Sequence, residues 1–450
     1  MTASNATGVL RVWGKDQRSA VTGADVSPIT VATMSTGPKA VRLTLHLNLT
    51  AYASGTVTYT VTWTENGHSK SLSVAASALN SPQTTTGMPW PDDSTTVTVQ
   101  VTGTFAATAA VETTVEVLQE ADFLLYVNDP NGLTQAAIDD AVSSGYTGIY
   151  LDANVTYAVT STLTLGASGG TNQPFILRST MYGGSRYGSR DVPPAHYISI
   201  SGVTDGIHVP DGATKVRLEG VAVIGTASGA CVHLNGAQES GLDSCYVKNT
   251  TNGSGYAVVV DASSGGGRPE GNTSSRCFFK GWRALGIGVS DVTYKPGNSL
   301  WNAITTDGVE SGVYLADGGN NVFLNWYDRS GPSVAAFNQV GGVAIVIGGE
   351  DYNSAVANDI ALSGGQLWIE RRAITGGGGT VDVSVTGGDL YLYGVRSNSY
   401  NVTQSNGTVT IGRDTYSASA TFTCNGGTMF YPTKSAHGKT PGGSGTITAY

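Results

Sequence analysis

The sequence has few cysteines and few charged side chains. Its 450 residues include four cysteines, and charged residues make up 13% of the chain. Disulfide-stapled folds are short and dense in cysteine, so that class of protein is excluded. Cys231, Cys245, Cys277 and Cys424 form no C-x-x-C pair. We therefore expect small, buried, apolar side chains at these positions, and we expect neither a metal nor a cofactor.

The sequence also lacks a basic stripe and a long apolar run. The formal net charge is -9, and the one tight basic pair, Arg371 and Arg372, directly follows Glu370. Nucleic-acid-binding proteins carry a clustered basic surface, so DNA and RNA are excluded as partners. No run approaches the ~18 apolar residues of a membrane span. The first residues lack the basic and apolar regions of a signal peptide, which predicts a chain made and folded in a cytoplasm.

Small, strand-forming and turn-forming residues are abundant instead. Hydrophobic residues make up 40% of the chain, and 61 residues are glycine. This apolar content excludes a disordered chain. Thr and Val favour strands, whereas Gly and Asn favour turns, so the composition predicts an all-β protein with many short strands. A single core stops growing at about 250–300 residues, so we expect either several domains or one elongated domain.

The first 120 residues alternate between apolar and polar side chains. The alternation runs through residues 41–47, 57–63, 97–101 and 114–117. Period-two alternation is typical of strands with one buried and one wet face. Several such strands at short spacing predict a small β-sandwich over residues 1–120.

A different pattern begins near residue 121. One helical face is visible in residues 133–142, and only short strands follow it. The strands fall into two series that recur at roughly 22–34 residues, the period range of solenoids. The first series lies at 216–218, 241–243, 275–277, 300–302 and 322–324, and the second at 231–234, 257–260, 287–289, 313–315 and 344–347. We predict a parallel β-solenoid over residues 121–430, capped by the helix, and a Gly/Ser/Thr-rich tail over 431–450.

Three segments resemble a known group of proteins. The runs LTQAAIDDA at 133–141, TGIYL at 147–151 and YAVTSTLTL at 157–165 resemble the opening of the pectate-lyase-like right-handed parallel β-helix proteins. That group includes phage tailspikes, phage tail fibres, and polysaccharide lyases and hydrolases. The resemblance implies a right-handed parallel β-helix behind a short N-terminal capping helix. It is specific for the fold and says little of activity, because function resides in sites grafted on the fold.

Two features favour the phage branch of this group. The sequence predicts no signal peptide, and a β-domain precedes the capping helix, where tailspike-like proteins carry a virion-attachment module. The resemblance implies that residues 1–120 attach to other virion proteins, that the β-helix forms a parallel homotrimer, and that the protein is located on the virion.

Carboxylates could provide catalysis on such a scaffold. Glycoside hydrolysis usually needs two carboxylates about 5–10 Å apart, and equivalent residues of successive coils lie about 4.8 Å apart. The candidate acids near the strand ends are Asp317, Asp328, Glu350, Asp351 and Glu370. The alternative is structural, because Asp at a corner caps the turn by accepting backbone N–H bonds.

Aromatic side chains could bind sugars. Exposed aromatic rings suit stacking on sugar rings, and the candidates are Trp301, Trp326, Tyr327 and Trp368. The alternative is that a Trp within a first-series strand belongs to the core.

Three functions stay open: a virion surface protein that binds host glycans or a receptor, which we favour; a tailspike depolymerase acting as glycosidase or lyase; and a cellular β-helix adhesin or exported polysaccharide enzyme.

Overall fold

The structure is a computed structural model. It describes, side chains included, residues 124–143, 146–167, 174–184, 192–262, 269–290, 295–329, 334–350, 359–371, 382–395, 401–412, 415, 421–432 and 441–450, together with the backbone of further strands. The chain divides into two compact units, which are described separately. The first contains residues 1–132 and 137–152, and the second contains residues 133–136 and 153–450.

The N-terminal strands of the first unit form two sheets. One sheet has the order β2-β1-β10-β4-β7 with β8 beside β4, and the other has the order β3-β9-β5-β6. Their bounds are β1 (Ala6–Trp13), β2 (Arg18–Val21), β3 (Ile29–Val31), β4 (Ala40–Leu49), β5 (Thr56–Trp63), β6 (Ser69–Ala75), β7 (Gln83–Thr84), β8 (Met88–Pro89), β9 (Val97–Thr102) and β10 (Ala109–Leu118). The four alternating segments fall within β4, β5, β9 and β10. The side-chain packing of the predicted sandwich lies outside the described residues.

The first unit also contains most of the predicted helix. Strand β11 (Leu124–Val127) pairs in parallel with β12 (Gly148–Leu151), and α1 (Gln135–Ser143) lies between them in the chain. The helix buries Ile138 and Ala141, two of the residues on the predicted apolar face. Within the described part of the chain, no helix combines the length and apolarity that crossing a membrane requires.

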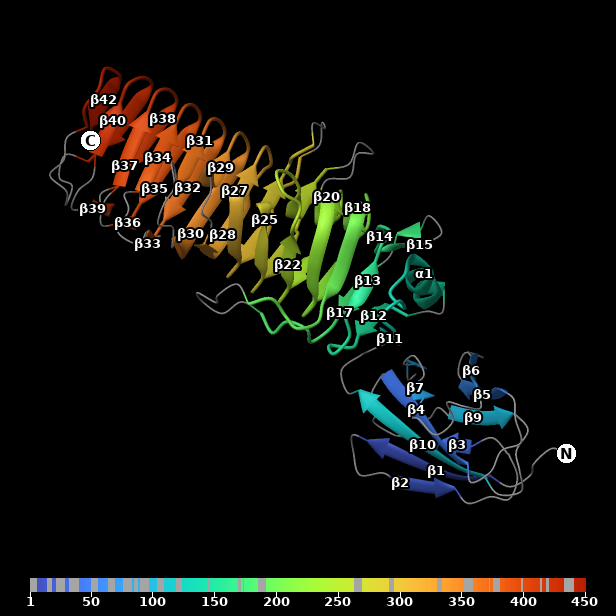
Figure 1. The fold of residues 1–450 in the computed structure, drawn as a ribbon. Helices are drawn as coiled ribbons and strands as arrows, with labels where there is room; N and C mark the ends of the chain where they lie inside the picture. Colours follow the sequence, from blue (N-terminus) through green and yellow to red (C-terminus); the bar gives the residue numbers. More distant parts are fainter. Residues whose placement is uncertain are drawn as a thin grey trace. The chain divides into compact units, whose positions relative to one another are not determined.

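The second unit is a parallel β-solenoid of about 10 turns (Figure 1), as predicted. Each coil adds a strand to three ladders, in which every strand bonds to its equivalent in the next coil. The first ladder contains β17 (Phe175–Arg178), β19 (Val216–Glu219), β21 (Gly241–Asp243), β24 (Thr273–Ser275), β26 (Leu300–Asn302), β28 (Asn321–Asp328), β30 (Val343–Asp351), β32 (Gln366–Glu370), β35 (Asp389–Tyr393), β38 (Thr408–Ile411), β41 (Thr428–Tyr431) and β42 (Thr446–Ala449).

Several long strands turn a corner and serve two ladders. The second ladder contains β13 (Tyr157–Val159), β18 (Ile198–Val209), β20 (Ala222–Asn235), β22 (Tyr246–Asn249), β25 (Phe278–Ile287), β27 (Thr305–Leu315), the ends of β28 and β30, β33 (Ala373–Ile374), β36 (Arg396–Ser397) and β39 (Tyr416–Ser417). The third contains β14 (Leu163–Thr164), the later parts of β18, β20, β25 and β27, and β23 (Tyr256–Asp261), β29 (Ala335–Gln339), β31 (Ile360–Leu362), β34 (Val381–Val385), β37 (Tyr400–Gln404) and β40 (Thr421–Cys424). The short β15 (Ala167–Ser168) and β16 (Thr171–Asn172) pair with each other.

The two predicted strand series correspond to the first and third ladders, with one correction. Residues 344–347 were assigned to the second series, but they lie in β30 and pair with β28 in the first ladder. The third-ladder strand of that coil is β29, which pairs with β27. Its sequence AAFNQ is poor in strand-forming residues, so the apolar and polar pattern does not predict this strand. The tail predicted over 431–450 adds β42 to the first ladder.

Inward-facing side chains fill the solenoid. All four cysteines are buried and unpaired, as predicted, and burial raises the pKa of Cys231 to about 12. The Trp301 ring stacks on Phe323 with ring centroids 6.1 Å apart, and Phe337 meets Phe323 edge-on at 5.5 Å. Large aromatic side chains therefore make up much of the middle of the core.

A column of glycines forms the corner between the third and first ladders. These residues have φ between 74° and 77°, and they are Gly342, Gly365, Gly388, Gly407 and Gly427. Each approaches the coil before it closely: a Cβ on Gly365 would lie 2.1 Å from the carbonyl oxygen of Gly342. The same carbonyl accepts a hydrogen bond from the N–H of Gln366 at 2.8 Å. Glycine is required here both by the positive φ and by the contact.

Candidate functional site

Two of the predicted acids occupy structural positions. Asp328 has 0% exposure and accepts a hydrogen bond from the Thr306 hydroxyl at 2.7 Å, while Nε1 of Trp326 donates to that hydroxyl at 2.9 Å. Asp317 accepts a bond from the N–H of Gly318 at 2.7 Å and lies 3.4 Å from Nζ of Lys295. Asp328 is thus part of a buried polar network, and Asp317 caps a corner.

The remaining acids lie on different ladders. Glu350 is in the second-ladder part of β30, in register with Tyr327, and Glu370 ends the first-ladder strand β32. Asp351 is in register with Asp328, but its side chain lies outside the described residues. Asp317 and Glu350 do not lie in one column, because Asp317 follows the third-ladder part of β27 and Glu350 lies in the second-ladder part of β30.

Three of the four predicted glycan-binding aromatics lie in the core. Trp301 has 1%, Trp326 2% and Tyr327 7% exposure. A sugar ring cannot reach the face of a buried ring, so these residues are corrected to core positions. Trp368 differs, because 39% of its surface is exposed.

Trp368 belongs to an outward-facing grid of six residues that we term the aromatic platform. Alternate residues of β32 face those of β35 in register, giving the pairs Gln366 with Asp389, Trp368 with Tyr391, and Glu370 with Tyr393. The residues between them are buried leucines and an isoleucine. The Trp368 ring stacks on Tyr391 at 4.2 Å and on Tyr393 at 5.6 Å, with 16° between planes in both cases. The strand pairing thus places three aromatic rings together on the surface.

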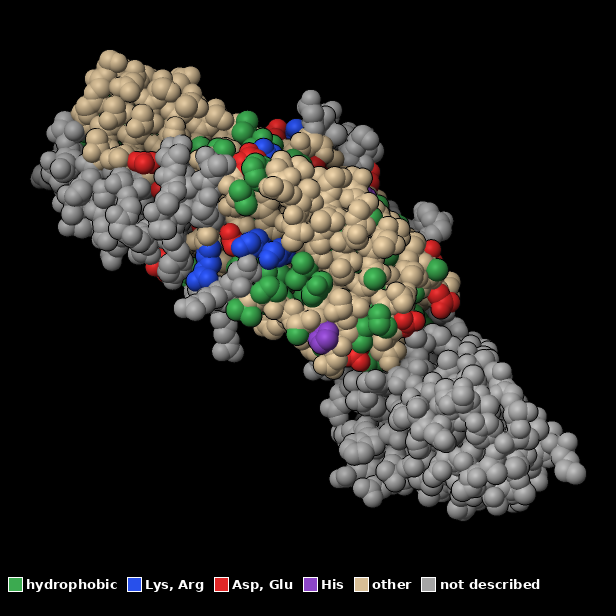
Figure 2. All heavy atoms as spheres, viewed as in Figure 1, with side chains coloured by type: hydrophobic (Ala, Val, Ile, Leu, Met, Phe, Trp, Pro, Cys, Tyr) green, Lys and Arg blue, Asp and Glu red, His purple; other side chains and the backbone are tan. Residues whose placement is uncertain are grey.

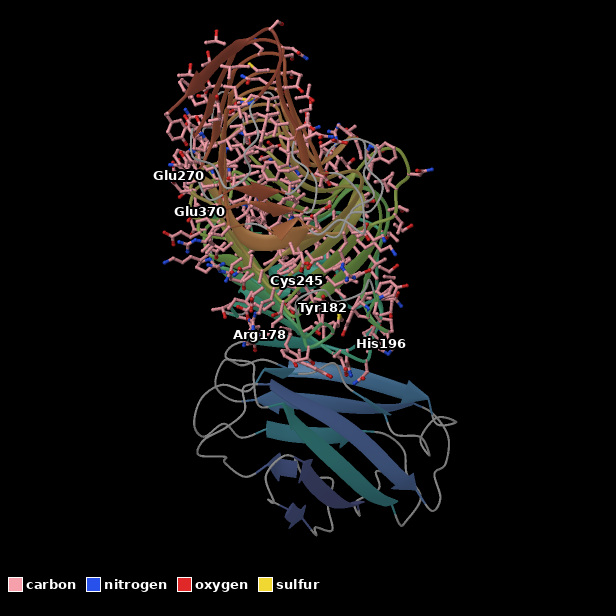
Figure 3. All side chains as sticks on the ribbon, turned by 90° about the vertical axis from the view of Figure 1, so that its left-hand side faces the viewer. Arg178, Tyr182, His196, Cys245, Glu270 and Glu370 are labelled. Atoms are coloured by element: carbon pink, nitrogen blue, oxygen red, sulfur yellow. The ribbon has the colours of Figure 1, made fainter. Side chains whose placement is uncertain are left out.

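Polar groups border the aromatic platform at both ends. Nε2 of Gln366 donates to Oδ2 of Asp389 at 3.4 Å. At the other end, Oε1 of Glu370 lies 3.3 Å from Nε of Arg371, and these side chains are 46% and 79% exposed. Figure 3 shows Glu370 at the outer edge of the coils. The border offers both donors and acceptors, and solvent screens this exposed ion pair.

A second surface cluster surrounds Arg283. Its guanidinium bonds to Glu310 at 2.7 and 2.9 Å and to the Tyr256 hydroxyl at 2.6 Å, and lies 4.0 Å from the centroid of the Tyr314 ring. Partial burial acts to lower the pKa of Arg283, but the bonds to Glu310 and Tyr256 outweigh it and raise this pKa. Nε1 of Trp282 also donates to Glu310 at 2.5 Å. These partners occupy much of the cluster's hydrogen-bonding capacity, so it serves mainly to hold three coils together.

Sequence reasoning missed a third cluster, formed by Asp205, His208 and His233. His208 and His233 are register partners on β18 and β20. Nδ1 of His233 lies 2.9 Å, and Nδ1 of His208 3.6 Å, from Oδ2 of Asp205. Partial burial acts to raise the pKa of Asp205, but hydrogen bonds with both histidines outweigh it and hold this pKa well below its usual range. Among the described residues, these three form the group whose ligand atoms converge closely enough to hold a metal.

No protein-family model and no curated protein matches the chain. Similar solved structures include a GH87 α-1,3-glucanase from Streptomyces thermodiastaticus (14% identity, 94% of this chain and 87% of that chain, TM-score 0.32). They also include PfbA, a surface adhesin of Streptococcus pneumoniae (11% identity, 71% of this chain and 87% of that chain, TM-score 0.42). A third is the enzymatically active domain of bacteriophage CBA120 tailspike protein 2 (11% identity, 71% of this chain and 48% of that chain, TM-score 0.38). These are β-helix proteins, the class that the sequence resembles. At such identities and TM-scores the likeness assigns no activity to this chain.

Proposed function

We propose that this protein is a bacteriophage virion surface protein that binds host-surface glycans through the aromatic platform. The observation that carries the glycan part is the exposed Trp368, stacked on Tyr391 and bordered by polar side chains. The virion part rests on the sequence resemblance, in which a β-domain precedes the capping-helix motif. The N-terminal unit would then attach to other virion proteins.

The chemistry of the aromatic platform suits a neutral or weakly charged sugar. Aromatic rings provide rigid, amphipathic contact area, and the C–H face of a sugar ring packs against such a surface. Gln366, Asp389, Glu370 and Arg371 can bond to the hydroxyls that surround a packed ring. Figure 2 shows uncharged polar side chains and backbone over much of the described surface, together with scattered charges and an apolar patch.

The geometry favours binding over cleavage. The two platform carboxylates, Glu370 and Asp389, stand at opposite ends of the paired strands. Four residues along a strand correspond to roughly 13 Å, which exceeds the carboxylate spacing of about 5–10 Å in glycosidases. Asp328 is buried and would not contact a polysaccharide. A depolymerase therefore has less support than an adhesive surface.

Self-association of the same face is the second candidate. The two coils before the aromatic platform present Val322, Leu324, Ile345 and Ile347 outward, and each is partly buried. Such apolar columns suit a contact between subunits, and the resemblance implies a parallel homotrimer. Trp368 continues the column of Ile345, so a subunit contact over this face would cover the aromatic platform and compete with glycan binding there.

Binding of the full chain to a panel of bacterial surface polysaccharides tests the proposal. Trp368→Ala and Tyr391→Ala are expected to weaken binding about tenfold, because a stacked aromatic contributes about 0.5–1.5 kcal/mol beyond area burial and 1.4 kcal/mol corresponds to a factor of ten. Tyr450→Ala, which removes an aromatic 44% exposed at the C-terminus, serves as the control and should bind like wild type.

Two further readouts separate the alternatives. Unchanged binding in both platform variants, with wild-type circular dichroism, contradicts the glycan site. A fall in the mass measured by light scattering in these variants would instead assign the face to subunit contact. Release of reducing ends by wild type, lost in Glu370→Gln, would establish a depolymerase.

A further inference from the structure

The histidine–carboxylate cluster lies across two coils near the start of the solenoid. β18 contributes Asp205 and His208, and β20 contributes His233. The side chains of all three are 16–23% exposed, so a small ion can reach them while most of the surrounding water is excluded. The two imidazole rings meet edge-on, with centroids 5.3 Å apart.

The positions of the three ligand atoms suit one small cation. The two imidazole nitrogens lie 2.9 and 3.6 Å from Oδ2 of Asp205, and all three atoms lie within 4.8 Å of one another. In a tetrahedral site with bonds of about 2.0–2.2 Å, ligand atoms lie roughly 3.3 Å apart. Small side-chain rotations would therefore bring the three atoms around a common centre.

The surrounding backbone holds Asp205 in place. Its Oδ1 accepts a hydrogen bond from the N–H of Ala230 at 3.0 Å, which is the kind of outer contact that orients a metal-binding carboxylate. The pairing of β18 with β20 shifts register between Val203 and Asp205, and such irregularities re-aim side chains. Gly229 leaves room for the carboxylate, because a Cβ there would lie 2.7 Å from Oδ1.

The second ring nitrogen of His233 is not the one that contacts Asp205. This nitrogen, Nε2, is buried and has no hydrogen-bond partner among the described residues. Buried polar atoms without a partner are exceptions in native proteins, and an ion or water usually accounts for them. Because Nδ1 and Nε2 diverge from one ring and cannot bind the same ion, a cation held at Nδ1 would leave Nε2 of His233 for an outer contact, such as a water.

We propose that Asp205, His208 and His233 bind one divalent transition-metal ion, with Zn²⁺ as the species that fits best. Two imidazoles and one carboxylate are ligands typical of zinc, whereas Ca²⁺ and Mg²⁺ prefer all-oxygen sites. Three protein ligands leave a fourth position for water. The bound ion joins β18 to β20 and so links two successive coils, independently of the glycan surface.

Titration of Zn²⁺ into chelator-treated, tag-free full-length protein tests this assignment. Wild type is expected to bind one equivalent with a Kd near or below about 1 μM, a level that isothermal titration resolves well. His233→Ala and Asp205→Asn should each weaken binding at least about 100-fold. His196→Ala is the matched control, since this labelled histidine (Figure 3) contacts Thr156 at 3.5 Å outside the cluster; its affinity should match wild type.

A second measurement guards against misfolded variants. X-ray absorption at the zinc edge of wild-type protein should show two imidazole ligands and light oxygen scatterers, and Ca²⁺ in excess should not displace the zinc. Binding that is absent, or equally tight in His233→Ala and Asp205→Asn, overturns the proposal. So does a zinc spectrum with sulfur or without imidazole.

Discussion

Replacing Trp301 with alanine is expected to lower the free energy of unfolding of the solenoid by about 3–5 kcal/mol, the usual loss for a buried large aromatic. The ring is 1% exposed and stacks on Phe323, so truncation removes apolar contacts and leaves a cavity between coils. Urea-induced unfolding followed by circular dichroism measures the loss as a lower midpoint.

Two companion variants make this experiment sharper. Trp301→Phe should be milder than Trp301→Ala, because the indole N–H has no hydrogen-bond partner among the described residues and its removal leaves no new polar group unpaired. Trp368→Ala should lose about 1 kcal/mol, since its ring is partly exposed and its loss breaks mainly the stacking on two tyrosines. Equal losses at the two tryptophans would contradict the assignment of one to the core and the other to the surface.

Gly365→Ala is expected to destabilise the solenoid by at least about 2 kcal/mol. A non-glycine residue at φ 75° costs about 1–2 kcal/mol, and the new Cβ would lie 2.1 Å from the carbonyl oxygen of Gly342. That carbonyl must move away, which weakens its bond to the N–H of Gln366. Amide hydrogen exchange should therefore rise first in Gln366 and the neighbouring residues of β32.

Gly319→Ala is the matched control for this corner. No atom lies within 4 Å of a Cβ built there, and Gly319 is not among the residues with positive φ. Its unfolding midpoint should stay within the range of ordinary surface substitutions, about 0.5 kcal/mol. If both variants unfold like wild type, close packing at the glycine column does not limit stability.

The ladders could be predicted from the sequence because each strand is short, apolar in alternation and bounded by turn residues. The period located the first ladder from β19 to β28 and the third ladder from β20 to β27. It failed at β29, where Ala, Asn and Gln interrupt the apolar signal. The sequence also did not predict which side chains of three-residue strands such as β26 point into the core, because alternation over three positions does not fix which side chain points inward.

The functional positions were harder to predict because they depend on register between coils. Trp368 meets Tyr391 and Tyr393 only once β32 pairs with β35. His208 and His233 are likewise joined by the pairing of β18 with β20, and a register shift aims Asp205 at them. The available signal was two histidines at equivalent positions of consecutive coils, which becomes visible after the ladders have been aligned.

The in-register stacking of coils makes the second unit a molecular ruler. Each strand of the first ladder bonds to the next, so six steps separate β19, in the coil of His233, from β32, which carries Trp368. At about 4.8 Å a step, the two positions are roughly 29 Å apart along the stack. Gain or loss of one whole coil between them would change this spacing by a fixed increment while leaving each local arrangement intact. Evolution can therefore change the distance between the histidine cluster and the aromatic platform in steps of one coil.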